Sequence, residues 1–249
     1  MAAILLAGVA AGTINTIVGS GTLITFPTLL ALGVPPVTAN VSNTIGLVPG
    51  SISGTIGYRR ELVGQRRRLL RLASASVLGG IGGAVLLLVL PSSAFDAIVP
   101  VLIGVGVVLV VLGPSIGRRV AARHAARGGL PEHGAPWVWP AVLGTGVYGG
   151  YFGAAQGVLL MAVLGIGVDD DLQRHNATKN VLALLVNAVA AVVFIAVAEV
   201  DWAVAGLIAL GAILGGQIGA GVGRRLPATA LRAVIVLVGV VALVALLTD

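Results

Sequence analysis

The sequence predicts an all-α polytopic membrane protein made of two inverted repeats, in which the first apolar segment of each repeat is broken and turns back. Composition, an internal duplication and a reversal of loop charge lead to this prediction. Of the 249 residues, 57% are hydrophobic and 10% are charged, and the mean hydropathy is +1.07. Because so few polar residues cannot cover a soluble domain, the expected solvent of this chain is the lipid bilayer.

The chain repeats itself at an offset of 136 residues. Leu78-Gly79-Gly80 recurs as Leu214-Gly215-Gly216, and Asn40 is matched by Asn176. Two related halves with a substrate held between them are typical of secondary transporters. We therefore divide the chain into a first repeat (1–112), a basic linker expected to be cytoplasmic (113–136) and a second repeat (137–249).

The sequence contains eight apolar stretches, and a bilayer core of about 30 Å requires roughly 20 apolar residues per helix. Their connections are mostly short. The expected segments are Ala2–Gly33, Asn40–Gly57, Leu69–Leu90, Ala94–Leu112, Val138–Val168, Val181–Ala198, Trp202–Gly223 and Ala228–Leu247. The first and the fifth are longer than one span requires. Each also contains a glycine cluster, Gly19-Ser20-Gly21 in the first and Gly149, Gly150, Gly153 and Gly157 in the fifth.

The loop charges indicate how the halves are inserted, because cytoplasmic loops collect Lys and Arg. Arginines gather at 58–71 and 118–127. In the second half the signs are reversed: the acidic stretch 199–201 matches 58–71, and Arg224 and Arg225 stand close to the position that matches the base-free turn at Pro91. Opposite insertion requires an odd number of crossings in each half. We therefore expect the opening segment of each half to form a re-entrant hairpin, broken at its glycine cluster.

A second group of glycines is better explained by close helix packing than by a break. This group comprises Gly79, Gly80, Gly82, Gly83, Gly215, Gly216 and Gly219.

Polar residues inside an apolar protein cost free energy, so their clustering is informative. Each half has such residues at its break and at the start of the next segment. The motif Asn40-Val41-Ser42-Asn43 pairs with Asn176-Ala177-Thr178-Lys179, and each motif is expected to open a helix, whose positive end attracts an anion. The candidate substrate-binding residues are Asn15, Thr16, Gly19, Ser20, Gly21, Thr22, Asn40, Ser42, Asn43, Gln156, Gly157, Asn176, Thr178 and Lys179.

Plainer explanations exist for the same residues. The side chains of the two motifs could cap helices, and Lys179, the only lysine, could extend to the membrane interface. We interpret the stretch 169–171, three aspartates, as a solvated approach to a helix. Neither a metal nor a cofactor is expected, because the chain has no cysteine and no cluster of histidine with carboxylates.

At these residues the sequence resembles the TauE/SafE family of sulfite exporters. The motifs are the stretch 8–21, Phe26-Pro27 and the stretch 39–44, and in the second half 146–157 with Asn176-Ala177-Thr178-Lys179. The resemblance covers nearly the whole chain. It departs from the family pattern at Ala154-Ala155-Gln156-Gly157, where the family often has a run of glycines.

The resemblance implies a multi-pass secondary transporter of the cell membrane. Its expected substrates are small anions such as sulfite, organosulfonates and related organic acids, exported by alternating access and coupled to a proton or sodium gradient. A homo-oligomer is left open. Nucleic acid is not an expected partner, because the arginines lie in short loops and not on one continuous face.

Other function classes remain as alternatives. An intramembrane serine hydrolase could use Ser20, but Val18 replaces the first glycine of the GxSG pattern and no histidine lies within an apolar stretch. A lipid-binding scaffold could use the arginine loops, although it needs no polar residues at membrane depth. A cation transporter usually needs embedded carboxylates, which here stand at the ends of the stretches.

The reversal of loop charge gives a topological prediction. In single-cysteine variants of this cysteine-free chain, cysteines at Arg66 and Arg225 should react with a membrane-impermeant maleimide from the cytoplasmic side, and cysteines at Pro91 and Glu199 from the opposite side. Labelling of Arg66 and Arg225 positions from opposite faces would contradict inverted halves.

Overall fold

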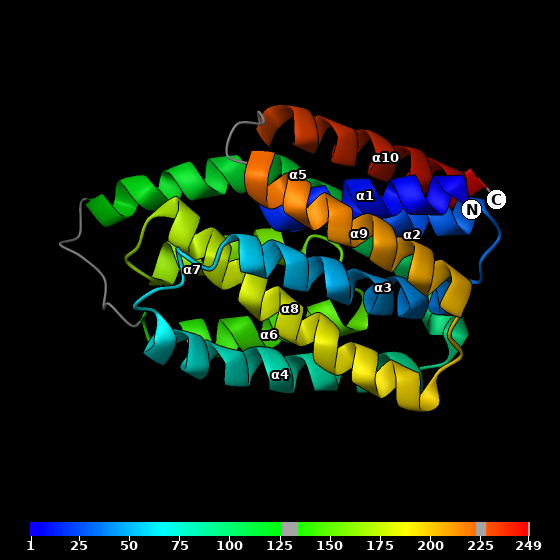
Figure 1. Cartoon of the computed structure of the whole chain (residues 1–249), viewed down its shortest axis with the longest axis horizontal. Coiled ribbons are helices and arrows are strands. Elements are labelled where there is room, and N and C mark those ends of the chain that lie inside the picture. Colours follow the sequence, from blue (N-terminus) through cyan, green and yellow to red (C-terminus); the bar gives the residue numbers. More distant parts are fainter. Residues whose placement is uncertain (126–133, 223–227, 249) are drawn as a thin grey trace.

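The computed structural model describes residues 1–125, 134–222 and 228–248, which form ten helices and no strand (Figure 1). Stretches of α4, α5, α8 and α9 are long and apolar enough to cross a membrane. The all-α polytopic fold class is therefore confirmed. The helices are α1 (Ala2–Ile17), α2 (Thr22–Ala31), α3 (Pro36–Gly57), α4 (Arg66–Val89), α5 (Ser92–Ala125), α6 (Val138–Tyr151), α7 (Gln156–Gly167), α8 (Leu172–Val197), α9 (Trp202–Val222) and α10 (Ala228–Thr248).

The order of the helices repeats along the chain. Each half contains two short helices followed by three long ones. Four helices of the second half begin 136 residues after their counterparts, at the offset found in the sequence. The paired first residues are Ala2 and Val138, Pro36 and Leu172, Arg66 and Trp202, and Ser92 and Ala228.

The opening segment of each half is interrupted, as predicted, between α1 and α2 and between α6 and α7. The two interruptions are built alike. The Gly19 N–H donates to the Ile14 carbonyl (3.0 Å), and the Gly153 N–H donates to the Tyr148 carbonyl (3.1 Å). Both glycines have positive φ angles, +87° and +77°, which end a helix without the steric cost that a side chain would add.

Each interrupted pair folds back on itself as a hairpin. In the second half the Ala135 N–H, just before α6, donates to the carbonyl of Gly167 at the end of α7 (2.8 Å). In the first half Gly21 lies against α1, where a Cβ on it would be 3.1 Å from the Asn15 Cβ. Figure 1 shows α1 and α2 side by side, with the N-terminus and the start of the α2–α3 connection at the same end.

The helix connections gather at two opposite ends of the molecule (Figure 1). We call the end with residues 58–71 and 168–171 the basic end, and the end with Pro91 and residues 199–201 the acidic end. The end of α9 and the start of α10 also lie at the basic end, while residues 223–227 between them lie outside the described residues. If the two halves are inserted in opposite orientations, the connection between α3 and α4 and its counterpart between α8 and α9 must lie at opposite ends, as they do here.

The halves pack through their glycines. Helix α1 runs along α9, and α6 runs along α4. A Cβ on Gly215 would lie 2.1 Å from the Val9 carbonyl oxygen, and one on Gly83 would lie 2.1 Å from that of Val147. The packing interpretation is confirmed at these two positions and at Gly79, Gly80, Gly216 and Gly219. The packing interpretation is wrong for Gly82, where an added Cβ would have no neighbour closer than 3.8 Å among the described residues.

Two expected boundaries were wrong. The polar motifs do not open helices, because α3 begins four residues before Asn40 and α8 begins four residues before Asn176. Proline at the first turn starts α3, and Asp171 caps α8 by accepting the Arg174 N–H (2.9 Å). In addition, α5 continues to Ala125, so the described start of the 113–136 linker is helical.

Gly83→Ala should lower the free energy of unfolding by about 1–3 kcal/mol, because the added methyl must push α6 away from α4. Gly82→Ala, one residue earlier in the same helix, is the matched control and should cost nothing. Thermal unfolding of both variants in detergent measures the difference; equal melting temperatures for the two would contradict the packing described here.

Candidate functional site

The tips of the two hairpins meet inside the protein. The Gly157 N–H donates to the Gly19 carbonyl (3.0 Å). A Cβ on Gly19 would lie 2.3 Å from the Gly157 Cα, so only two glycines permit this contact. Residues at the two breaks, nearly 140 positions apart in the sequence, therefore form one buried centre.

Side chains of the second half bind the exposed carbonyls at the end of α1. Lys179 Nζ donates to the carbonyls of Asn15 (3.1 Å) and Thr16 (3.2 Å). The Nδ2 groups of Asn176 and Asn180 also donate to Thr16, at 3.3 and 3.4 Å. The last carbonyls of a helix have no partner within it, and here the opposite half supplies the donors.

Conversely, a side chain of the first half binds the end of α6 in the second half. Asn40 of the first half donates from Nδ2 to the Tyr151 carbonyl (2.9 Å). Asn40 and Asn176 are thus matched in function as well as in sequence, since each binds the end of the other half's interrupted helix. Neither caps its own helix, so the capping explanation for these two asparagines is wrong.

Lys179 is fully buried, with 0% of its surface exposed, so it does not extend to the membrane interface. Its charge faces the negative end of the α1 dipole. An ammonium group has three N–H donors, and two of them are used by the carbonyls of α1. Among the described residues no acceptor is found for the third, which leaves one donor of a positive group for a ligand.

Asn43, which matches Lys179 in the first half, has a different role. Its Oδ1 accepts the hydroxyl of Thr25, and its Nδ2 donates to Thr22 Oγ1 (3.3 Å). Asn43 therefore holds the first turns of α2, and only the second half supplies a charge.

Several buried polar atoms at and beside the tips have no hydrogen-bond partner among the described residues: Ser20 Oγ, Gln156 Nε2, Tyr151 OH, and the amide oxygens Asn40 Oδ1 and Asn176 Oδ1. Ser20 lies two residues before Thr22, the first residue of α2, and Gln156 is the first residue of α7. Buried polar groups are nearly always paired, so an unpaired one indicates a place for a ligand or water. The helices α2 and α7 both begin at the tips, and most of their first N–H groups bind backbone carbonyls there, the Gly157 N–H to Gly19 among them.

Ser42 and Thr178 do not belong to this centre. Ser42 Oγ accepts the Asp201 N–H (2.9 Å) at the acidic end, and Thr178 Oγ1 donates to Gln65 Oε1 (2.7 Å) at the basic end. Both contacts join the two halves, and each is the 136-residue counterpart of the other. The structure therefore gives these two residues a bracing role.

Sequence reasoning missed an aromatic cluster next to the tips. The Phe26 and Phe152 rings are 5.0 Å apart, centre to centre, and Phe95 packs edge-on against both Phe152 and Tyr151. Phe95 belongs to the first turn of α5, at the acidic end. The signal was the scarcity of aromatic residues: the chain has four phenylalanines, and three of them gather here.

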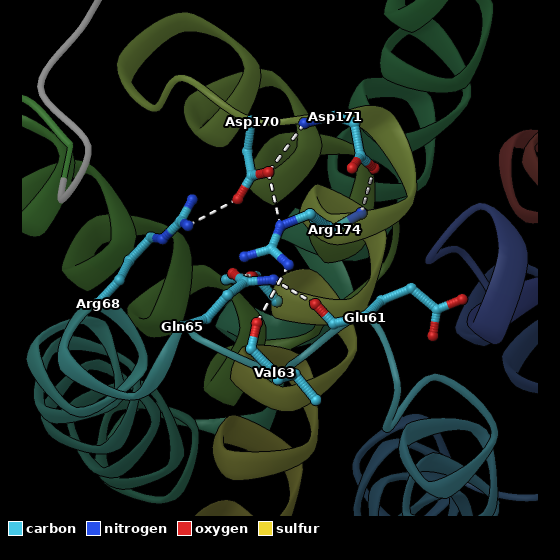
Figure 2. Close-up of polar contacts among 8 residues, drawn as sticks. Glu61, Val63, Gln65, Arg68, Asp170, Asp171 and Arg174 are labelled. Atoms are coloured by element: carbon cyan, nitrogen blue, oxygen red, sulfur yellow. Dashed lines mark hydrogen bonds and ion pairs between the residues drawn. The ribbon is translucent and has the colours of Figure 1, made fainter.

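The second missed feature is a partly buried ion-pair network at the basic end (Figure 2). Arg68 Nη2 donates to Asp170 Oδ2 (2.6 Å), and Arg174 Nε donates to Asp170 Oδ1 (2.7 Å). The interpretation of residues 169–171 as a solvated stretch is therefore wrong for Asp170. In the described part of the chain no cluster of three or more His, Cys, Asp or Glu could hold a metal ion.

Comparison with known proteins places the chain among membrane transporters. The family described as "Sulfite exporter TauE/SafE" matches residues 4–246. The chain is 29% identical over 240 residues to the "Probable membrane transporter protein YfcA" of Escherichia coli strain K12, which covers 96% of this chain and 86% of that protein. It is 28% identical to the "Probable membrane transporter protein ORF9" of Sinorhizobium sp., over 100% of this chain and 93% of that protein. No solved structure matches.

Ala155 gives a prediction at the tip, because it is the only described non-glycine residue with a positive φ angle, +61°. This conformation costs a side-chain-bearing residue about 1–2 kcal/mol. Ala155→Gly should therefore raise the free energy of unfolding by up to about 1 kcal/mol after the entropy that glycine costs. The control is Ala154→Gly, which is equally buried, has no positive φ and should lower the free energy of unfolding. Chemical denaturation of both variants in detergent measures the difference. An equal loss of stability in the two variants would contradict backbone strain at Ala155.

Proposed function

Because the chain belongs to the sulfite exporter TauE/SafE family of membrane transporters, we propose that it is a secondary transporter that exports small anions. The proposed substrates are sulfite, organosulfonates and related sulfur-containing or organic acids. The proposed setting is the cell membrane, with the substrate held between the two halves and transport coupled to a proton or sodium gradient.

The meeting of the two hairpin tips is the observation that carries this proposal. The starts of α2 and α7 lie at the tips together with the unpartnered polar atoms Ser20 Oγ and Gln156 Nε2. Lys179, which binds the carbonyls of Asn15 and Thr16 at the end of α1, adds a positive charge with a free donor. Corresponding interrupted helices with their N-termini directed to one place are a recurrent way to bind an anion inside a transporter. These groups favour an anion over a cation.

The surroundings of the tips support alternating access. On the acidic side, Phe26, Phe95 and Phe152 pack over them. On the basic side, the ion pair between Arg68 and Asp170 holds the two halves together. A closed barrier on each side, each made of groups from both halves, is what a transporter requires if one barrier opens at a time.

The enzyme alternative has little support from the site. Ser20 Oγ has no hydrogen-bond partner in the described part of the chain, so no base activates it there, and Lys179 is directed at backbone carbonyls. The family and the relatives' names also indicate a transporter and not an enzyme. A lipid-binding scaffold would give no reason for polar groups at the tips.

Transport by the purified protein in lipid vesicles tests the proposal. Vesicles loaded with sulfite, a small organosulfonate or acetate, under imposed proton or sodium gradients, should release at least one of the sulfur anions faster than protein-free vesicles. Equal release for every anion under both gradients would overturn the proposed function.

Lys179→Met should lower the transport rate by at least about tenfold, because a charged hydrogen bond is worth about 1.5–3 kcal/mol. Lys179→Arg should retain part of the rate, since it keeps the charge. Arg67→Met removes an exposed positive charge and is the matched control. Wild-type transport by Lys179→Met at equal protein levels would mean that helix ends and hydroxyls alone hold the anion.

A further inference from the structure

We propose that Arg68 and Arg174 form an access site for the transported anion at the basic end, and that the Asp170 carboxylate occupies this site while no anion is bound. This inference rests on the proposed anion transport. It adds a second, outer site to the one at the hairpin tips. In this proposal, binding of the anion at the outer site opens the basic end.

The geometry shows a site that is already filled by an anion of the protein itself. The two oxygens of Asp170 are each held by a different arginine, Arg68 at 2.6 Å and Arg174 at 2.7 Å, and the Asp171 N–H adds a third donor at 3.0 Å. Figure 2 shows the carboxylate between the two guanidinium groups. Oxyanions such as sulfite and sulfonates present the same negatively charged oxygen acceptors to arginine.

Arg68 has more donors than Asp170 uses. Only 5% of its surface is exposed, and its Nε and Nη1 atoms are buried without a partner among the described residues. His175 Nε2, one turn into α8, is likewise buried and unpaired. A buried guanidinium that has spare donors can bind a second anion as Asp170 leaves, which avoids the cost of an isolated buried charge.

The charges favour an anion at this place. Burial alone would raise the pKa of Asp170, but the hydrogen bonds from Arg68 and the Asp171 N–H, together with the charges of Arg68 and Arg174, lower the pKa below its usual value. The carboxylate is therefore ionised. Asp171 also lies beside Arg174, but residues 58–71 and 168–174 together carry seven arginines and four carboxylates, which leaves an excess positive charge at this end. That excess attracts an external anion without any protonation step.

The network also joins the two halves. Arg68 belongs to α4 of the first half, whereas Asp170 and Arg174 belong to the second. Arg174 Nη1 further donates to the Val63 carbonyl in the α3–α4 connection (3.1 Å). When an anion takes the place of Asp170, the link between Arg68 and the second half is broken, and the basic end can open.

The opposite end lacks such a network. At the 136-residue counterparts of Arg68, Asp170 and Arg174 the chain has Val204, Val34 and Thr38. Val34 and Val204 pack in the hydrophobic core. The bracing contact of Thr178 has a counterpart in Ser42, but the ion pairs have none, so an anion is expected to act on the basic end alone.

A cysteine reporter tests the proposal without any transport measurement. Ala177 is buried against Tyr58 and Ala220 at the basic end, and Val41, its 136-residue counterpart, is buried in the core. Single Ala177→Cys and Val41→Cys variants in lipid nanodiscs are exposed to a soluble maleimide with and without methanesulfonate, an anion of the proposed class that does not react with maleimides. Methanesulfonate should speed labelling at residue 177 about 5- to 10-fold, a usual range for such coupling, and should not speed it at residue 41.

Variants in the Ala177→Cys background separate the parts of the proposal. Asp170→Asn should label rapidly even without methanesulfonate, whereas Asp170→Glu, which keeps the charge, should remain slow. Asp169→Asn is the matched control, because Asp169 is exposed, and it should behave as the parent does. Adding Arg68→Gln to Asp170→Asn should abolish any remaining response to methanesulfonate.

Two results would overturn the inference: equal labelling of Asp170→Asn and Asp169→Asn, or rapid labelling of Asp170→Asn with no effect of methanesulfonate on the parent. If either occurs while the vesicles still transport a sulfur anion, the inference fails and the proposed function stands. If methanesulfonate opens the basic end but no anion is transported, the access site stands and the proposed function fails.

Discussion

Every interrupted helix leaves backbone carbonyls and N–H groups without partners, and inside a membrane water cannot supply them. The protein meets this constraint across its two halves. The end of α1 is bound by Lys179 and Asn176 of the second half, and the end of α6 is bound by Asn40 of the first. Neither interrupted helix is complete without the other half. The hairpins, their contact at Gly19 and Gly157 and the burial of the polar motifs all follow from this exchange.

The duplication makes the exchange between the halves nearly symmetric, but some contacts depart from this symmetry. The contact between Thr178 and Gln65 has its counterpart between Ser42 and Asp201. Lys179, by contrast, faces the carbonyls of α1, while Asn43 holds the threonines of α2. Aromatic rings lie on the acidic side of the tips, and ion pairs lie at the basic end. The two ends of one symmetric frame are thus closed by chemically different contacts.

Much of this architecture could be predicted from the sequence. Hydropathy predicted the long apolar helices, the glycine clusters predicted the breaks, and the repeat offset paired Asn40 with Asn176. The contacts of polar side chains between the two halves could not be predicted, because they join residues more than 100 positions apart. Asp170 was interpreted as solvated since nothing local distinguishes it from Asp169; only the approach of α4 places Arg68 beside it. The asparagine motifs resembled helix caps because capping and interior residues have the same composition.

The central claim is that the two hairpin tips hold the transported anion. Selenite is a close chemical analogue of sulfite, and its selenium scatters X-rays anomalously; the chain also has no cysteine for it to oxidise. A crystal structure with selenite, recorded at the selenium edge, therefore measures the position of the anion directly. The account predicts an anomalous peak between Ser20 and Gln156, within reach of Lys179 Nζ. A peak on the lipid-facing surface, with none at the tips at saturating selenite, would contradict it.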